Sequence, residues 1–382
     1  MHSFSCLVLL LVLHGHQLDG RFISPIDKRS PNRTKTRLLH KDVVEGDIML
    51  RADQFASFPA FPGESIDNFE PLLWEERVVP FVIDDSLTEP FTLDMVRQAA
   101  EYYSDRTCFS IIEDTEDKYS NRIRILSDRG CYSVLGRVDG AEQPLSLQNG
   151  DCWTFATVAH ELGHALGLFH TQSRPDRDRY IYVNKPVISK DGDGQFDRHS
   201  ELLKNYHGIP YEFGSIMHYD PDSFAKFAHV PTLIAKGQFA LYQNSMGGYM
   251  PSFYDVQLIN RMYNCSDQCD SSLITCQNGG YQDPKKCRIG GIGEKGKMEY
   301  ILNAPPKRRV LVTLLSATGD SFCELRGIEF KPAADLRPRG FRHCSSPIRR
   351  FVYTSETNRF PIIIYSLTSK KFTARIQYQW IY

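Results

Sequence analysis

Three histidines and one glutamate lie within a single segment at a spacing that suits a metal ion. Residues 160–170 read HELGHALGLFH. Side chains four residues apart lie on one face of a helix, so a helix here would direct His160 and His164 at the same metal. Gly167 tolerates the positive φ that lets a chain leave a helix sharply, and His170 can then return as a third ligand.

The chemistry that this set supports is hydrolysis at zinc. Three histidine ligands leave one coordination position open for water, as in catalytic rather than structural zinc sites. Zinc lowers the pKa of such a water to about 7 and polarises a carbonyl group, while Glu161 can accept the water's proton. The extended pattern, with its glycine and third histidine, is the metzincin signature and weighs against histidines that merely cap or pack a helix. We therefore expect one Zn2+ per chain and hydrolysis of peptide bonds by a zinc-bound water.

A second motif, SIMHY at residues 215–219, places Met217 47 residues after His170. It resembles the Met-turn of metzincins, in which the methionine packs beneath the metal site. Together with three other segments, it resembles the astacin family of zinc endopeptidases, in its nematode type. The four segments are residues 160–170, 174–178, 211–219 and 255–265, and the resemblance covers residues 40–290 well.

The resemblance implies a role for each residue of the site. His160, His164 and His170 match the zinc ligands, and Glu161 matches the general base. Tyr219 matches the family's switch tyrosine, which binds zinc at rest and swings out to stabilise the oxyanion with its phenol. Without the resemblance, the residue type alone favours an ordinary core aromatic at position 219.

The fold that the resemblance implies is α+β, with a two-lobed metzincin catalytic domain over residues 65–265. A twisted sheet and two long helices would form its upper lobe, and a loop-rich lower lobe would end in a helix. The apolar patterns predict helices over 92–103, 154–168 and 254–263, and strands over 78–83, 108–112, 122–126, 310–314, 361–365 and 372–378. Pro80 should mark an edge strand or a bulge.

Composition and the N-terminus indicate a secreted, modular protein. The 382 residues, 41% of them hydrophobic, suffice for more than one domain with a sizeable core. The 45 basic and 46 acidic residues nearly balance, which argues against a nucleic-acid or membrane-surface partner. The apolar run 4–13 is too short to span a bilayer and matches the core of a signal peptide, which we place at residues 1–20. A buried helix is the alternative. We expect an extracellular product with structural disulfides.

Residues 21–64 are expected to be a propeptide that makes the protein a zymogen. The segment 44–47 (VEGD) resembles the family's aspartate switch, so that Asp47 would take the water's position on zinc. The alternative is an ordinary Gly-Asp turn.

Two departures from the family concern activation. Thr171 stands where a glutamate usually pairs with the newly cut N-terminus, and no Lys or Arg lies between Arg51 and Arg77. A threonine cannot form that ion pair. We therefore expect maturation that tolerates a ragged N-terminus or a cut near Arg51.

Ten cysteines, of which Cys6 leaves with the signal, give an odd count of nine in the mature protein. The resemblance implies the catalytic-domain pairs Cys108–Cys265 and Cys131–Cys152, the pair Cys269–Cys287 in a truncated EGF-like segment (266–292), and the pair Cys323–Cys344 in a CUB-like β domain (293–382). Cys276 is then left unpaired or joined to another chain. Glycosylation sequons occur at Asn32 and Asn264, the second beside a disulfide that argues against its use.

The predicted function is a secreted zinc metalloendopeptidase that cleaves extracellular or matrix proteins and peptides. The CUB-like tail would bind a matrix or protein partner, or serve as a structural cap. The alternative is a catalytically idle extracellular binding protein that uses this tail. The complete set of ligands, Glu161 and Tyr219 weighs against it, whereas Thr171 and the shortened tail weigh for it.

Overall fold

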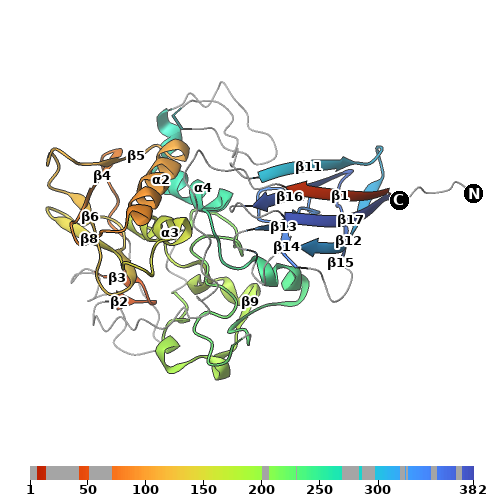
Figure 1. Ribbon diagram of the computed structural model, residues 1–382, viewed down its shortest axis with the longest axis horizontal. Helices are drawn as coiled ribbons and strands as arrows, with labels where there is room; N and C mark the ends of the chain where they lie inside the picture. Colours follow the sequence, from red (N-terminus) through yellow and green to blue (C-terminus); the bar gives the residue numbers. More distant parts are fainter. Residues whose placement is uncertain are drawn as a thin grey trace, which may run out of the picture. The chain divides into compact units, whose positions relative to one another are not determined.

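The computed structural model divides the chain into two compact units (Figure 1). The first comprises residues 34–240 with 246–290, and the second comprises residues 291–382 with 241–245 and the first 33 residues. The residues that it describes are 7–13, 43–50, 71–199, 206–228, 230–268, 284–285, 297–318, 323, 326–345, 351–366 and 372–382. Within these, no helix combines the length and the apolar character that a bilayer span needs.

A seven-stranded mixed sheet forms the centre of the first unit. Its strands run in the order β2-β3-β7-β8-β6-β4-β5. Their bounds are Val43–Val44 (β2), Ile48–Met49 (β3), Val78–Ile83 (β4), Ser110–Glu113 (β5), Arg122–Leu126 (β6), Cys131–Val134 (β7) and Glu142–Leu147 (β8). Strands β4, β5, β6 and β8 are parallel, whereas β7 pairs with β8 in antiparallel orientation. The strands expected over 78–83 and 122–126 are confirmed, and the strand expected over 108–112 begins at Ser110.

Pro80 lies neither on an edge strand nor at a bulge, so that prediction is wrong. Strand β4 lies between β6 and β5, and its pairing with both is continuous. The Phe81 carbonyl accepts a hydrogen bond from Asp114 N–H, beside β5, at 2.7 Å. Since successive residues face opposite neighbours, Pro80 faces β6, whose pairing with β4 begins only at Phe81 opposite Ile123. The Pro80 nitrogen, which has no hydrogen to donate, therefore lies just before the first residue pair of the β4–β6 ladder.

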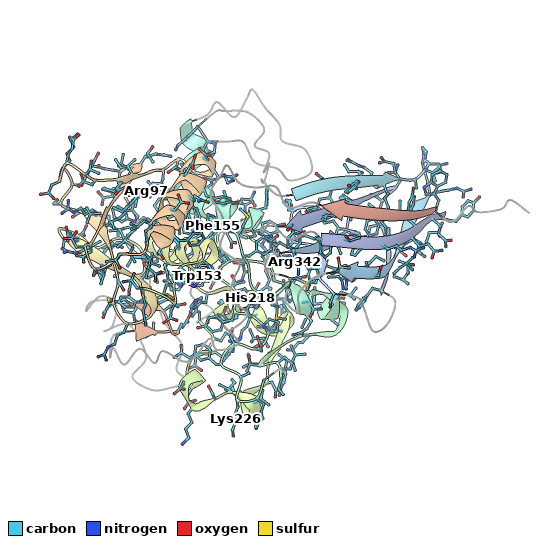
Figure 2. All side chains as sticks on the ribbon, viewed as in Figure 1. Arg97, Trp153, Phe155, His218, Lys226 and Arg342 are labelled. Carbon is cyan, nitrogen blue, oxygen red and sulfur yellow. A yellow bond between two sulfur atoms is a disulfide. The ribbon has the colours of Figure 1, made fainter. Side chains whose placement is uncertain are left out.

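Two helices pack together against this sheet (Figure 1). Helix α2 (Pro90–Arg106) starts with a proline in its first turn, where no helical hydrogen bond is lost. Helix α3 (Phe155–Ala165) starts after Thr154, whose hydroxyl accepts from Thr157 N–H at 3.0 Å. Arg97 projects from the outer face of α2 and pairs with Glu113 at 2.9 Å (Figure 2). The expected helices are confirmed, the first longer and the second shorter than predicted.

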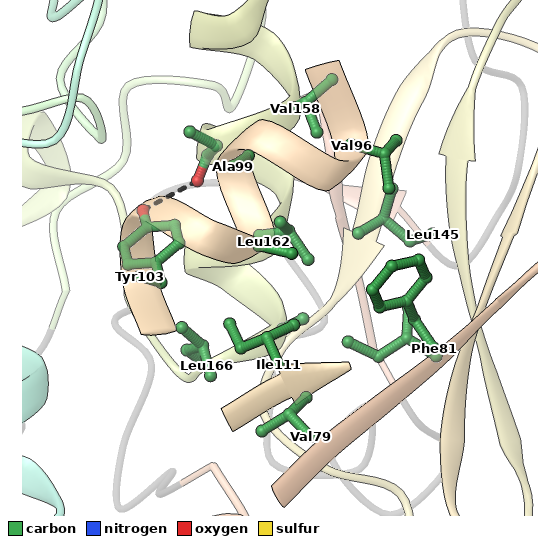
Figure 3. Close-up of a cluster of buried hydrophobic side chains, with 14 of the residues drawn as sticks. Val79, Phe81, Val96, Ala99, Tyr103, Ile111, Leu145, Val158, Leu162 and Leu166 are labelled. Atoms are coloured by element: carbon green, nitrogen blue, oxygen red, sulfur yellow. Dashed lines mark hydrogen bonds between the residues drawn. The ribbon is translucent and has the colours of Figure 1, made fainter. Parts of the chain in front are cut away.

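The core of the first unit lies between these helices and the sheet (Figure 3). The sheet contributes Val79, Phe81, Ile111 and Leu145, and the helices contribute Val96, Ala99, Val158 and Leu162. The Tyr103 hydroxyl of α2 donates to the Ala159 carbonyl of α3 at 2.8 Å inside this core. The position of α3, which carries the first two histidines, is thus fixed by both packing and a buried hydrogen bond.

The remainder of the first unit is loop-rich, as expected. Its 3-10 helices are Thr171–Ser173, Arg177–Arg179, Lys185–Val187, Lys190–Gly192, Gly237–Ser245 and Cys265–Gln268, and the fifth of these reaches the residues assigned to the second unit. Strands β9 (Ile181–Val183) and β10 (Leu233–Ala235) form a small antiparallel pair. Helix α4 (Phe253–Met262) begins with a capping box, in which Ser252 and Asp255 exchange side-chain-to-backbone hydrogen bonds of 2.6 and 3.1 Å.

The structure contains the disulfides Cys108–Cys265, Cys131–Cys152 and Cys323–Cys344. The first joins residues 157 positions apart. In the chain-entropy model, closing a loop of this length lowers the entropy of the unfolded chain and so stabilises the folded state by roughly 5 kcal/mol. Residues 269, 276 and 287, and the sequon at Asn32, lie outside the described residues. Asn264 is exposed, next to the first disulfide, with a φ of 49°.

The second unit consists of two four-stranded sheets around a common apolar core. One sheet has the order β1-β17-β12-β15 and the other the order β11-β16-β13-β14. Their bounds are Leu7–Leu13 (β1), Lys297–Asn303 (β11), Arg309–Thr318 (β12), Arg326–Phe330 (β13), Phe341–His343 (β14), Phe351–Thr354 (β15), Arg359–Ser366 (β16) and Phe372–Ile381 (β17). The antiparallel β module expected here is confirmed, whereas its CUB-like nature remains a prediction.

Strand β1 is the segment in which we expect the signal peptide. It pairs in antiparallel orientation with β17, from Leu7 opposite Tyr378 to Leu13 opposite Phe372. The alternative of a buried helix is therefore wrong. Cleavage of residues 1–20 stays a prediction, and it would remove this edge strand from the sheet.

Burial of His343 in the second unit should make that unit sensitive to acid. Its ring lies 4.3 Å from that of Phe351 and its Nε2 contacts the Tyr353 hydroxyl, and burial lowers the pKa of His343 to about 4. Because the unfolded pKa is near 6.5, protonation favours the unfolded state, and stability should fall by roughly 3 kcal/mol between pH 6.5 and 4. Hydrogen exchange of β12 and β16 amides, corrected for intrinsic rates, should show this loss of protection. In His343→Leu the acid-dependent part should disappear, and an unchanged pH slope would contradict the assignment.

Candidate metal centre

The three histidine side chains converge on one point, as their spacing predicts. His160 and His164 lie one turn apart on α3, and Gly167, with a φ of 95°, turns the chain just after the helix ends. The His160 Nε2 atom lies 3.0 Å from that of His164 and 3.2 Å from that of His170. Four-coordinate zinc with bonds of 2.0–2.1 Å would hold its nitrogen ligands about 3.3 Å apart. The separation of the imidazoles therefore fits such an ion.

The outer nitrogens of the same rings fix which atoms face the centre. The Nδ1 atom of His160 lies 2.7 Å from the Ile216 carbonyl, and that of His164 lies 2.8 Å from the Leu168 carbonyl. A carbonyl only accepts hydrogen bonds, so both Nδ1 atoms carry the proton and both Nε2 atoms present lone pairs. Lone pairs facing each other at 3 Å repel, and a bound cation removes that repulsion. The donor set thus fits a zinc ion.

A carboxylate from the N-terminal part of the chain completes the group. Asp47 lies with its carboxylate oxygens 3.2 Å from the Nε2 atoms of His160 and His170 and 3.5 Å from that of His164. The ligand atoms of all four residues lie within 4.8 Å of one another. The Oδ1 atom of Asp47 is buried and has no hydrogen-bond partner among the described residues. An acceptor left in that position fits the fourth ligand of the same ion.

The carboxylates and imidazoles of the site shift one another's pKa. Burial opposes the charged form of Asp47, but the neighbouring imidazoles outweigh it and hold the pKa of Asp47 well below its usual range. Burial likewise disfavours charged His170, yet the carboxylates of Asp47 and Glu45 raise the pKa of His170 to about 10. Burial lowers the pKa of His164 to about 4. A proton on His170 thus balances the charge when the metal is absent, and a divalent cation would displace that proton.

Asp47 is held in place by a short hairpin of β2 and β3. Glu45 and Gly46 in its turn both have positive φ, 49° and 86°. A Cβ on Gly46 would lie 3.3 Å from the Tyr219 hydroxyl oxygen and from the Phe224 ring, so the turn also requires glycine for space. Strand β3 then pairs with β7 in parallel orientation, and Ser133 N–H donates to the Asp47 carbonyl at 2.9 Å.

Glu161 lies beside the histidines but is not engaged with them. Its side chain is 2% exposed, and its Oε2 atom has no hydrogen-bond partner within the described part of the chain. Burial, assisted by the negative charge of Asp47, raises the pKa of Glu161 well above its usual value. A carboxylate in such an environment is a stronger base than one in water, which suits proton transfer.

Met217 and Tyr219 lie on the turn beneath and beside the histidines. Asp255 of α4 holds this turn, because it accepts from the Ser215 hydroxyl at 2.5 Å and from Ile216 N–H at 2.9 Å. Met217 is buried below α3, where a Cβ on Gly163 would lie only 2.9 Å from its sulfur. The Tyr219 ring lies 4.8 Å from that of His170, between ring centroids.

Comparison with known proteins is consistent with this geometry. The family model of the peptidase family described as Astacin matches residues 68–264, just over half of the chain. The chain belongs to the astacin family.

Several curated relatives of this chain are zinc metalloproteinases of nematodes. Zinc metalloproteinase nas-31 of Caenorhabditis elegans is 31% identical over 86% of this chain and 62% of its own length. The corresponding values are 29%, 82% and 66% for zinc metalloproteinase nas-29 and 30%, 92% and 73% for nas-23 of the same organism. The chain thus spans less than two thirds of the first two relatives. High choriolytic enzyme 1 of Oryzias latipes, a hatching enzyme zinc-protease, is 31% identical and matches 49% of this chain and 89% of its own with a TM-score of 0.44.

Three further residues of this astacin, Thr171, Arg174 and His218, are buried close to the site. The Thr171 hydroxyl donates to that of Ser215 at 3.0 Å inside the unit. Arg174 forms a two-pronged ion pair with Asp176 at 2.8 and 2.9 Å. His218 lies in the interior (Figure 2), with Nδ1 2.7 Å from the Tyr219 carbonyl.

Sequence reasoning missed two residues that contact the site from far away in the chain. Glu45 was noted only as part of the aspartate-switch motif, yet its carboxylate lies 2.9 Å from Nδ1 of His170. His199 was not singled out at all, and its Nε2 lies 2.6 Å from Glu45. Neither residue has a diagnostic spacing to the motif of residues 160–170, so no local signal could have identified them.

The tight contact between Gly163 and Met217 predicts a non-additive pair of substitutions. Gly163→Ala should gain about 1 kcal/mol of helix propensity but lose roughly 1–3 kcal/mol by overpacking against the Met217 sulfur. In a Met217→Ala background the second effect should vanish, so that Gly163→Ala becomes neutral or stabilising. Urea unfolding of the four proteins in this cycle measures the coupling. Additive free energies would show that the contact does not constrain α3.

Proposed function

We propose that this astacin is a secreted zinc endopeptidase, made as a zymogen, that cleaves extracellular or matrix proteins. The observation that carries the proposal is the convergence of three imidazole Nε2 atoms on one point, with Asp47 opposite them and the unpaired Oε2 of Glu161 beside them in the described part of the chain. His160, His164 and His170 would hold the ion, one per chain. When bound, zinc supplies Lewis-acid polarisation of the substrate carbonyl and acidifies the attacking water.

Glu161 would serve as the proton acceptor in this reaction. It follows the first ligand on α3, so its carboxylate lies next to the position that Asp47 fills in this structure. Its buried setting favours acceptance of the water's proton during attack on the carbonyl carbon. The protonated carboxyl can then give that proton to the leaving amine, which completes cleavage without a second acid.

Tyr219 would stabilise the oxyanion once the hairpin of β2 and β3 has left. In this structure its hydroxyl donates to the Glu45 carbonyl, so the phenol has a donor role towards oxygen. Its backbone is fixed by Gln172, whose Oε1 accepts from Tyr219 N–H at 3.0 Å. A preorganised donor at a developing negative charge contributes on the order of 3–4 kcal/mol.

Latency would follow from the same hairpin. Asp47 takes the coordination position that water needs, and β3 pairs with the edge of β7. Exposed strand edges bind extended peptides by main-chain hydrogen bonds, so β3 would exclude a substrate from this edge. Removal of the propeptide, residues 21–64, would release both the metal position and the strand edge.

The disulfides and the apolar N-terminus support secretion, because disulfides persist in oxidising compartments. The two-sheet unit supports a CUB-like tail for residues 293–382, and we propose that it binds a matrix or protein partner. The presence of Glu161 beside the three converging histidines weighs against the idle-protein alternative.

Glu161→Gln should abolish catalysis without emptying the metal site. The amide cannot accept a proton, so kcat/KM for a quenched fluorescent peptide should fall by about 10²–10⁴-fold while zinc stays near one per chain. Elemental analysis and peptide cleavage after verified propeptide removal measure the two quantities. Glu116→Gln is the matched control, since that carboxylate is 69% exposed and pairs only with surface Lys118 at 2.7 Å in the described structure. Equal activity in Glu161→Gln and the control would refute the assigned base.

Asp47→Asn should weaken latency. A neutral amide is a poorer zinc ligand than a carboxylate, so the unprocessed protein should cleave peptide at least about ten times faster than unprocessed wild type. Gel analysis during the assay must show that the propeptide is still attached. Equal latency of the two unprocessed proteins would show that Asp47 lies in an ordinary turn.

A further inference from the structure

The three histidines of the centre differ in where their outer hydrogen-bond partner comes from. His160 uses the main-chain carbonyl of Ile216, on the turn at Met217, and His164 uses that of Leu168, just after its own helix. His170 uses the carboxylate of Glu45, 125 residues earlier in the chain, at 2.9 Å. A carboxylate partner raises the basicity of an imidazole ligand and fixes its ring orientation. The third ligand thus depends on a residue of the expected propeptide.

Glu45 is positioned for this contact at a conformational cost. It is a non-glycine residue with a φ of 49°, a conformation that costs roughly 1–2 kcal/mol and persists only where surrounding contacts impose it. Its side chain is 6% exposed, and both carboxylate oxygens are engaged. The Oε2 atom contacts Nδ1 of His170, and the Oε1 atom contacts Nε2 of His199 at 2.6 Å.

His199 provides the other half of a preformed carboxylate site. It is 2% exposed, and its main-chain N–H donates to the Ser173 carbonyl at 2.7 Å. Its Nδ1 lies 3.3 Å from the Tyr206 hydroxyl, and its ring packs edge-on against Phe169 at 5.1 Å. The imidazole thus has main-chain, hydroxyl and ring contacts in addition to its contact with Glu45.

We propose that His199 and His170 form a buried carboxylate-binding site for Glu45, which makes Glu45 a second anchor of the prosegment and a positioning residue for the third metal ligand. The prosegment then acts on the metal twice, directly through Asp47 and indirectly through Glu45 and His170. The zymogen holds its metal more tightly than the processed enzyme. This inference rests on the proposed zinc site but not on peptidase activity.

The physical reason is the loss of an acceptor on processing. When residues 21–64 are removed, Nδ1 of His170 exchanges a buried carboxylate for a weaker partner, while His160 and His164 keep their carbonyls. Changes of this kind around a ligand alter metal affinity by about 10–100-fold. The difference in zinc affinity between the zymogen and the processed enzyme should therefore have two contributions. One depends on Glu45 and the other depends on Asp47.

The test compares rates of zinc transfer to a chromogenic chelator from full-length and processed protein. Wild-type zymogen should lose zinc at least about ten times more slowly than processed wild type. Zymogen Glu45→Gln, which keeps the shape of the side chain, should lose zinc about ten times faster than wild-type zymogen. Processed Glu45→Gln is chemically identical to processed wild type, since residue 45 is gone, and must show the same rate. Zymogen Glu116→Gln should retain zinc as the wild type does.

Variants of His199 separate anchoring from general structural damage. His199→Leu should speed zinc loss from the zymogen but not from the processed enzyme, because His199 acts on His170 through Glu45. His199→Gln offers an amide N–H to Glu45 and should restore part of the slow rate. Thermal unfolding confirms that each variant is folded.

Two outcomes would overturn the proposal. One is a zymogen Glu45→Gln that holds zinc as tightly as wild type, and the other is a His199→Leu variant that loses zinc equally fast before and after processing. Failure of the proposed function shows separately, as processed enzyme that binds zinc but cleaves no peptide.

Discussion

The close approach of three imidazole Nε2 atoms, 3.0 Å between His160 and His164 and 3.2 Å between His160 and His170, is the constraint on which the rest of the first unit depends. Such an arrangement is unfavourable without a cation, so every neighbouring element must hold the rings in place. Helix α3 supplies two of them, and its own position is set by the core and by the hydrogen bond from Tyr103. Gly167 turns the chain so that the third can return. The turn at Met217, tied to α4 through Asp255, supports the helix from below.

The hairpin of β2 and β3 places negatively charged side chains against the same three imidazoles. Asp47 faces the three inner nitrogens, and Glu45 binds the outer nitrogen of His170. The two carboxylates sit on opposite sides of one imidazole, and their joint effect is seen in the raised pKa of His170. A propeptide that merely covered a cleft would need neither charge. The proposed prosegment would be complementary to the ion itself, and this complementarity would link latency to metal retention.

Much of the fold could be anticipated because its signals are local. The period of apolar residues located α2, α3 and α4 to within a few residues, and the pattern of residues 160–170 identified the donors. Pro80 shows where local reasoning fails. Proline cannot donate a hydrogen bond to a neighbouring strand. Whether position 80 needed such a bond depended on the pairing of β4 with β6, and this pairing begins only at the next residue, Phe81. The interior roles of Arg174 and Thr171 were missed for the same reason, since their partners were decided by packing.

The sequence by itself determined the chemistry of the centre. Two histidines four residues apart lie on one face of a helix, and a glycine allows the chain to turn sharply after the helix ends. The sequence also indicated the oxidising environment and a modular β-rich tail. Only the tertiary structure decided what completes the outer hydrogen bonds of the ligands. Glu45 and His199 are 154 residues apart and meet through burial of a charged group that must find partners inside the protein. Such pairing is a property of the folded chain as a whole, and no short segment encodes it.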